Sequence, residues 1–434
     1  MFAYYLEMAL RSLKRSRGLT ALMIAAVAMG IGACMTTLTV VHVLSGDPLP
    51  GRSDRVFRAM VDPEEIGGYV PGSDPLDQVS WIDGMNLLSA RKADRQALMS
   101  GGSVTVRRPD ATATAFYTAA RYTTADLFGM FGLHFVYGSP WTQADDDARA
   151  RLVVITRSLN EKLFGGVDST GRALEVAGTA LRVQGVVDDW APKPHFHDLE
   201  VGSFGDVEQV FMPLTTSRDL HASRSGSTSC WDSSHSSEAD LEHASCVWLQ
   251  FWVELDSPTK REAYRDFLVA YSRQQHEAGR FQRPPNVRLL DVSQWLDHKA
   301  VVPGDVKLQA WLAGAFLVVC LVNTVGLMLA KFLRRSNEVS VRRALGASRR
   351  AIMAQLLVEA AMVGLAGGAA GLLLALGGLW LVRMQPERYA ALAHMDLPML
   401  GLTFALAVAS TILAGWLPAW RACRIAPALQ LKSS

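Results

Sequence analysis

Apolar residues gather in four long runs, one near the start of the chain and three in its last third. The runs cover 18–45, 307–333, 352–383 and 397–420, and they contain few charged side chains. A helix rises about 1.5 Å per residue, so each run is long enough to cross the ~30 Å hydrocarbon core of a bilayer. We therefore predict four transmembrane helices over these ranges.

Residues 1–17 show a different pattern. Apolar side chains recur there at every third or fourth position, and basic residues lie between them. This spacing predicts a cytoplasmic amphipathic helix at the membrane surface. Because the apolar run that starts at Leu19 continues to Leu44 without turning polar, the pattern favours an uncleaved span over a signal peptide.

Basic residues outside the long middle segment fall on one side of the predicted spans. They lie in 1–17, in the loop 334–351 and in the tail 421–434. The short loop 384–396 and the segment 46–306 fall on the other side if the four spans alternate. The positive-inside rule therefore predicts cytoplasmic termini and a large extracytoplasmic domain over 46–306.

The segment 46–306 is long enough to bury a core of its own. Period-two apolar patterns predict strands at 56–61, 104–106, 173–176, 181–187 and 247–255, and helical spacing predicts helices at 80–88, 124–131, 156–164 and 258–276. Gly178 between two of these strands predicts a hairpin. The predicted fold class is an integral membrane α-helical protein with four transmembrane helices and a large α+β extracytoplasmic domain.

The composition agrees with a protein that is partly in a membrane and partly in water. Hydrophobic residues make up 50% of the chain, charged residues 19%, and the formal net charge is +2. Such a charge gives no reason to expect a nucleic acid partner. The sequence contains no G-x-x-x-x-G-K-[ST] phosphate loop, nucleophile elbow or zincin motif, so we expect no catalytic residues and no cofactor in this chain.

The stretch 337–371 joins a short basic helix to a glycine-rich span. Helical spacing places Val341, Ala344 and Leu345 on one face of the short helix. Gly346 is a predicted bend, because glycine tolerates backbone angles that other residues avoid. Ser348 is a predicted N-cap for the span that follows.

The sequence from Glu338 to Ser348 reads EVSVRRALGAS, and Glu359 and the glycine run come after it. This motif resembles the signature of the MacB/FtsX/LolC-type ABC transporter permeases, although that family often has glycine where this chain has Ser340. In the family the segment is a coupling helix that docks on an ATPase subunit. The resemblance therefore implies ATPase-coupling residues at Glu338, Val341, Arg342, Arg343, Ala344, Leu345 and Gly346.

The extracytoplasmic segment also resembles this family. It is similar to the MacB-like periplasmic core domain of type VII ABC systems. The similarity lies in Asp126-Leu127-Phe128, Leu163-Phe164-Gly165 and the glycines around them. It implies two subdomains, one of them inserted in the other at about 121–244.

As a whole, the resemblance implies a permease subunit of the bacterial inner membrane that works by mechanotransmission. The resemblance implies that a separate MacB/LolD/FtsE-like ATPase subunit binds ATP and Mg²⁺. Hydrolysis of this ATP would drive a conformational change of the periplasmic domain for export or efflux. The partners implied are that ATPase, a second permease copy or paralogue in a dimer, a periplasmic adaptor with an outer-membrane channel, and membrane lipid. FtsX-like signalling and LolC/E-like lipoprotein release remain alternatives, and the cargo is open.

Two cysteines, Cys230 and Cys246, lie in the predicted extracytoplasmic segment, whereas Cys34 and Cys320 lie in spans and Cys423 in the cytoplasm. An oxidising compartment favours a disulfide between the first two. Their spacing also admits a zinc site completed by His235 and His243, which we consider the less favoured alternative.

Two other polar stretches of the extracytoplasmic segment are predicted to be surface loops. The first, His195-Phe196-His197-Asp198, could offer metal ligands, but a His-x-His pair in a proline-containing stretch is typical of a loop, so we predict no metal site there. The second, 217–245, has the Ser-, His- and Asp-rich composition of a mobile loop.

Several residues inside the spans are predicted to pack helices together. Asn323 and Thr324 should hydrogen-bond to another helix, because lipid offers them no partner. Glu359 fits a structural role better than a proton relay. Two overlapping G-x-x-x-G patterns predict close helix packing, which we expect within the chain, at Gly364, Gly367, Gly368 and Gly371.

Overall fold

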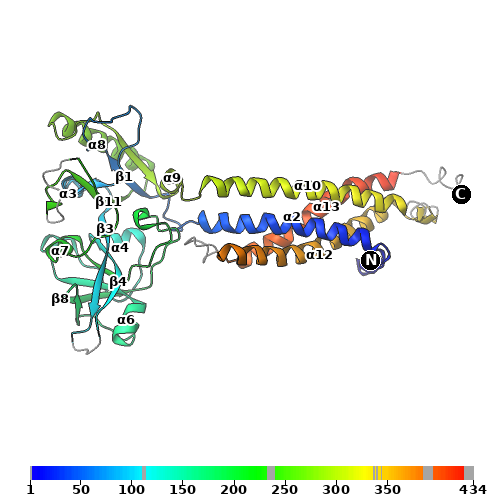
Figure 1. The fold of residues 1–434 in the computed structure, drawn as a ribbon, viewed down its shortest axis with the longest axis horizontal. Coiled ribbons are helices and arrows are strands. Elements are labelled where there is room, and N and C mark those ends of the chain that lie inside the picture. Colours follow the sequence, from blue (N-terminus) through cyan, green and yellow to red (C-terminus); the bar gives the residue numbers. More distant parts are fainter. Residues whose placement is uncertain are drawn as a thin grey trace. The chain divides into compact units, whose positions relative to one another are not determined.

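The computed structural model describes residues 2–109, 114–231, 240–335, 338, 341–343, 345–384 and 394–424. The chain forms two compact units, one of Gly46–Val301 and the other of Met1–Ser45 with Val302–Ser434 (Figure 1). Most of the predicted loop 384–396 and of the tail 421–434 lies outside the described residues.

The second unit is helical. In the part of this unit that the structure describes, a short helix precedes four helices that are long and apolar enough to cross a membrane. These elements are α1 (Phe2–Arg15), α2 (Arg17–Leu44), α10 (Gly304–Arg334), α12 (Arg349–Arg383) and α13 (Leu397–Arg424). The start of α12 is fixed by Ser348, whose hydroxyl accepts the N–H of Ala351 at 3.2 Å, as the N-cap prediction requires.

One glycine pair of α12 faces α13. A Cβ atom at Gly364 would lie 2.1 Å from Thr411 Oγ1 and 2.9 Å from the carbonyl oxygen of Ala407. At Gly368 it would lie 3.0 Å from the Cβ of Ala407. Because real Cβ atoms do not approach other atoms so closely, the two helices pack at this distance only with glycine.

The other glycine pair faces α2. A Cβ atom at Gly367 would lie 2.6 Å from Val27 Cγ1, and one at Gly371 would lie 3.1 Å from the carbonyl oxygen of Ala28. Each G-x-x-x-G pattern of α12 therefore packs against a different helix, and both of these helices belong to the same chain.

The first unit is built on a single twelve-stranded sheet with the strand order β12-β1-β11-β3-β4-β9-β6-β8-β5. Its strands are β1 (Val56–Val61), β2 (Val79–Ser80), β3 (Arg95–Arg107), β4 (Phe116–Thr123), β5 (Phe135–Gly138), β6 (Leu152–Thr156), β7 (Ala173–Val176), β8 (Thr179–Val187), β9 (Val210–Pro213), β10 (Ser229–Cys230), β11 (Cys246–Glu254) and β12 (Val287–Asp291). Its helices are α3 (Trp81–Ala90), α4 (Leu127–Phe131), α5 (Gln143–Asp147), α6 (Arg157–Phe164), η1 (Leu199–Val201), α7 (Leu214–Asp219), α8 (Pro258–Glu277) and α9 (Val292–His298).

The sheet has two halves that meet where β3 pairs with β4, antiparallel from Met99–Thr123 to Val106–Phe116. One half contains β12, β1, β11 and β3, and the other contains β4, β9, β6, β8 and β5. In sequence, the strands of the second half run from Phe116 to Pro213, between β3 and β11. The second half is thus inserted in the first. Its last strand ends at Pro213, whereas the predicted insertion, 121–244, extends to residue 244.

The sequence of strand β11 is an almost continuous run of apolar residues. Phe251 and Val253 enter one hydrophobic cluster and Trp252 enters another, so the sheet is buried on both faces. The predicted hairpin is confirmed: β7 pairs with β8 antiparallel, and the two residues between them, Ala177 and Gly178, both have positive φ.

Candidate coupling site

Residues 338–346, which we predicted to be a coupling helix and call the coupling segment, end in a left-handed turn at Gly346, whose φ is +98°. The N–H of Gly346 donates to the carbonyl of Arg343 at 3.1 Å, and the N–H of Ala347 donates to that of Arg342 at 3.0 Å. These two bonds form a Schellman motif, which ends a helix by satisfying its last carbonyls. The predicted bend at Gly346 is confirmed.

The apolar face of the segment is uncovered in this chain. Leu345 is 83% exposed and Val341 is 54% exposed. We call these two residues the apolar tip. Ala344, which shares this face in the sequence prediction, lies outside the described residues.

Arg342 fastens the segment to the helices behind it. Its guanidinium pairs with Glu338 at 2.6 Å, donates to Gln355 of α12 at 3.0 Å and contacts Met8 Sδ of α1 at 3.7 Å. Arg342 is therefore engaged inside the chain, whereas the two residues of the apolar tip are exposed.

Behind the segment lies a buried carboxylate. Glu359 of α12 is 1% exposed and accepts hydrogen bonds from Ser12 Oγ at 2.6 Å and from Lys331 Nζ at 2.5 Å, with Arg335 3.4 Å away. We call Ser12, Lys331, Arg335 and Glu359 the ion cluster. It joins α1, α10 and α12, which agrees with the structural role expected of Glu359 and satisfies a charge that burial alone would make costly.

The ion cluster is connected to the coupling segment. Arg335, which pairs with Glu359, also lies 3.4 Å from Glu338, and Glu338 pairs with Arg342. Our sequence reasoning missed the partnership of Lys331 with Glu359. The available signal was that these opposite charges lie in two spans near the same predicted membrane surface.

Of the two polar residues predicted to join α10 to another helix, Thr324 differs from that prediction. Thr324 is buried, and its hydroxyl donates to the carbonyl of Cys320 in its own helix at 2.8 Å, so it needs no partner helix. The side chain of Asn323 is exposed on α10, and within the described part of the chain it has no hydrogen-bond partner.

In the other unit, the stretch His195–Asp198 is buried, so its prediction as a surface loop is wrong. Asp198 accepts from Arg121 at 2.7 Å and from Gln250 at 3.2 Å, and His197 Nε2 lies 3.0 Å from Glu208, which also pairs with Arg121. Burial was not evident from the local pattern, because Arg121 is distant in sequence.

These contacts change two pKa values. Burial alone would raise the pKa of Glu208, but the Arg121 guanidinium and His197 hold it well below its usual range. His195 is buried and lies near His197, and these two effects lower its pKa to about 4. His195 therefore stays neutral in the folded protein at pH values where an exposed histidine would be charged.

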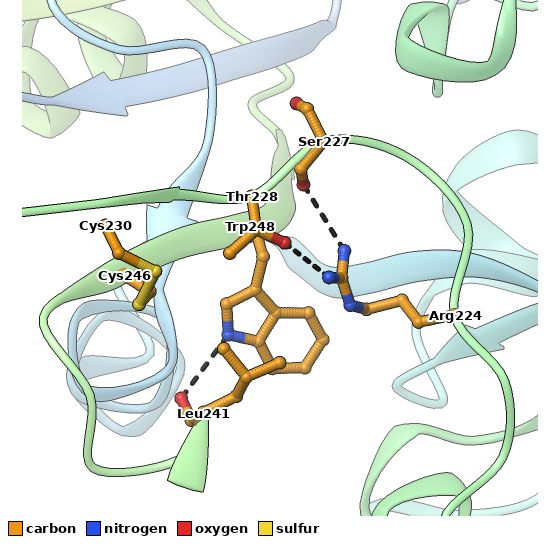
Figure 2. Close-up of a disulfide and its surroundings, with 7 residues drawn as sticks. All are labelled: Arg224, Ser227, Thr228, Cys230, Leu241, Cys246 and Trp248. Carbon is orange, nitrogen blue, oxygen red and sulfur yellow. Dashed lines mark hydrogen bonds between the residues drawn. A yellow bond between two sulfur atoms is a disulfide. The ribbon is translucent and has the colours of Figure 1, made fainter. Parts of the chain in front are cut away.

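The cysteines Cys230 and Cys246 are joined by a disulfide that ties β10 to the start of β11 (Figure 2). Beside it, the indole of Trp248 donates to the carbonyl of Leu241 at 3.4 Å, and the Arg224 guanidinium lies 5.3 Å from its ring centre. Leu241 is buried. The described parts of 217–245 are thus attached to the sheet and differ from the mobile loop we predicted.

Among the residues that the structure describes, no three His, Cys, Asp or Glu side chains lie close enough together to form a metal site. His235, a member of the alternative zinc set, lies outside the described residues.

Comparison with known families and relatives gives consistent matches. The MacB-like periplasmic core domain matches residues 20–271, and the FtsX-like permease C-terminal domain matches 311–427. The macrolide export ATP-binding/permease protein MacB 1/2 of Paracoccus denitrificans is 29% identical over 306 residues, which are 70% of this chain and 40% of that protein. MacB of Wolinella succinogenes is 22% identical over 441 residues, 99% of this chain and 60% of that protein.

The chain therefore spans 40% to 60% of the length of these two relatives. Among solved structures, the periplasmic region of MacB from Actinobacillus actinomycetemcomitans is similar, with a TM-score of 0.38 and 14% identity over 59% of this chain and 97% of that one.

Proposed function

Because this chain belongs to the MacB/FtsX-type family of ABC transporter permeases, we propose that it couples ATP hydrolysis by a separate ATPase subunit to movement of its extracytoplasmic domain, for export. The observation that carries the proposal is the apolar tip. Leu345 is 83% exposed at the end of a segment that is otherwise fastened to the helices. An exposed leucine held on a rigid base fits an anchor for a groove on another protein.

The contacts behind the tip supply a route for force. A displacement of the segment would act on Arg342 and Glu338, then through Arg335 on the ion cluster, and so on α10 and α12. In sequence, α2 comes directly before the unit Gly46–Val301 and α10 comes directly after it. Helices continuous with that unit are suited to transmit a small displacement, because packed helices move as rigid elements.

The remaining partners belong to the same proposal. Both relatives described above are named as ATP-binding/permease proteins, so we propose that ATP and Mg²⁺ are bound by an ATPase subunit that docks on the coupling segment. The exposed amide of Asn323 supports a second permease copy or a paralogue against α10, because an amide in a bilayer gains from a hydrogen bond across helices. We further propose that the chain lies in the inner membrane and that a periplasmic adaptor and an outer-membrane channel complete the export path.

The test is Leu345→Glu. We expect the ATPase to be lost from co-purification, and efflux to fall to background, because a carboxylate at the centre of an apolar interface is left unpaired. Expression and the size-exclusion profile should be unchanged, since Leu345 contacts little of its own chain.

Val167→Glu is the matched control, because Val167 is a 50% exposed apolar residue of the extracytoplasmic unit. It should retain the ATPase. Retention of the ATPase and of efflux in Leu345→Glu would contradict the coupling role. In the unmodified complex, recovery of a periplasmic adaptor would support export, and recovery of a cell-wall hydrolase would support FtsX-like signalling instead.

A further inference from the structure

A cavity of about 340 Å³ opens where α1, α2 and α10 come together. Arg15, at the end of α1, lines it together with Lys331, Arg334 and Arg335 near the end of α10. Among the described residues that line it, Glu338 is the one carboxylate. The lining is therefore strongly cationic, and the cavity volume lies in the range of small-ligand sites.

Two of these four cationic side chains already pair with a carboxylate, and the other two have no ion-pair partner among the described residues. Lys331 and Arg335 pair with the buried Glu359, at 2.5 and 3.4 Å. Arg15 and Arg334 are exposed and have no ion-pair partner among the residues that the structure describes. The engaged pair thus already has a counter-charge in Glu359, and the guanidiniums of Arg15 and Arg334 are free to bind an anion.

The polar lining adds groups that suit a phosphate. Ser16 lines the cavity and stands before the first turn of α2, where its side chain makes no capping hydrogen bond. Ser12 also lines the cavity, but its hydroxyl already donates to Glu359 in the ion cluster. The first turn of a helix carries a partial positive charge, so its position beside two guanidiniums further favours an anion.

Apolar surface continues from the cavity along both helices. Leu19 belongs to the lining, and Leu22, three residues further along α2, is 56% exposed. On α10, Leu333 is 45% exposed beside Arg334, and Ala330 is exposed one turn away. A ligand that joins an anionic group to hydrocarbon chains would satisfy both surfaces, whereas a free anion would use the charged part alone.

We propose that this cavity binds the headgroup of an anionic phospholipid, with its phosphate between Arg15 and Arg334 and its acyl chains along Leu22 and Leu333. The apolar continuation and the position at the ends of two membrane-crossing helices favour lipid over free phosphate. Because Glu338 belongs to both the cavity and the coupling segment, the bound headgroup would lie beside the residues that hold Arg342 in place.

The test uses the full chain, delipidated in detergent and titrated with phosphatidylglycerol or with phosphatidylcholine of the same acyl chains, followed by native mass spectrometry. Phosphatidylglycerol should bind more tightly than phosphatidylcholine. Each of Arg15→Gln and Arg334→Gln should weaken phosphatidylglycerol about fivefold, and the double variant about thirtyfold, without affecting phosphatidylcholine.

Arg350→Gln is the control, since Arg350 is an exposed arginine near the start of α12 that does not line the cavity. It should bind both lipids as the unmodified chain does. Equal phosphatidylglycerol affinity in the double variant and the control would overturn the proposal. Full displacement of the lipid by equimolar inorganic phosphate would identify a free-phosphate site instead. If the double variant lost the ATPase on co-purification but bound phosphatidylglycerol as before, the cavity would be a protein-docking site. That result would also overturn the proposal.

Discussion

Single residues of α12 differ sharply in the space around them, although several are glycine. Gly364 would bring a Cβ atom to 2.1 Å from Thr411 Oγ1, whereas a Cβ atom at Gly377 meets nothing within 4 Å. We predict that Gly364→Ala destabilises the helical unit by about 1–3 kcal/mol, because α12 and α13 must move apart or strain. Thermal denaturation of the purified chain in detergent would measure the loss.

Gly377→Ala is the control for this prediction, because it makes the same chemical change in the same helix. It should leave the melting temperature unchanged or slightly higher, since alanine favours a helix over glycine. Equal destabilisation by both variants would show that helix-wide effects, and not the contact with α13, govern the response.

His195 makes the stability of the extracytoplasmic unit depend on pH. Its pKa is lowered to about 4 in the folded protein, while an unfolded chain keeps about 6.5, so unfolding takes up a proton between these values. Stability should therefore fall by about 3 kcal/mol as the pH falls from 6.5 to 4. Chemical denaturation followed by tryptophan fluorescence at several pH values would measure this slope.

His195→Gln is the matched variant, because glutamine does not titrate, and it should flatten the slope in this interval. Comparing the two proteins is necessary because Asp146 acts in the opposite direction. Burial raises its pKa to about 7, so its contribution is present at low pH and is lost as the pH rises through that value. An identical slope in both proteins would exclude His195 as the source.

The same residue shows where sequence reasoning failed. The segment around His195 contains prolines and short polar residues, and such a pattern is typical of a loop. Its burial depends on Arg121, which supplies the charge for Asp198 from a strand distant in sequence. A local pattern contains no information about that partner. By contrast, Gly346 and Ser348 were predictable, because a helix stop and an N-cap depend on the residue itself and its neighbours.

At the level of elements the agreement was uneven: β1, β7 and α8 were predicted closely, whereas β3 was predicted only over 104–106 and β4 was not predicted. The predicted strands 56–61 and 173–176 coincide with β1 and β7, and the helix predicted at 258–276 differs from α8 by one residue. No strand was predicted at β6 or β9, which have five and four residues. Strands this short are determined by pairing with distant partners more than by their own propensity.

The ion cluster provides a prediction about how elements are held together. In Glu359→Gln, Lys331 would keep its buried charge without a counter-charge, so we expect a loss of about 3–5 kcal/mol of stability. Combining this change with Lys331→Met should recover part of the loss, because the pair is then removed as a unit. Thermal denaturation of the two single variants and the double variant gives the coupling free energy.

Glu7→Gln is the contrasting control, since Glu7 pairs with Arg11 in α1 where both side chains are largely exposed. It should change the stability by less than about 1 kcal/mol. A Glu359→Gln variant as stable as Glu7→Gln would mean that the ion cluster contributes little to the assembly of α1, α10 and α12.

At the scale of the whole molecule, the central expectation is that the unit Gly46–Val301 and the coupling segment lie on opposite sides of the membrane. The basic residues of 1–17 and 334–351 favour the cytoplasm, and four membrane-crossing helices then place Gly46–Val301 outside. Exposed side chains are suitable labelling sites: Leu345 is 83% exposed in the segment, and Tyr117 is 78% exposed in the extracytoplasmic unit.

We predict that a membrane-impermeant maleimide labels Tyr117→Cys in intact spheroplasts, and labels Leu345→Cys only after the membrane is disrupted. The native cysteines allow this design, because Cys34 and Cys320 are buried and Cys230 is in a disulfide. Cys423 would be replaced by serine in both variants, so that each chain carries one reactive thiol. Labelling of both positions in intact spheroplasts would place the apolar tip and the large unit on the same side, where the tip could not dock on a cytoplasmic ATPase, and the proposed coupling would fail with the topology.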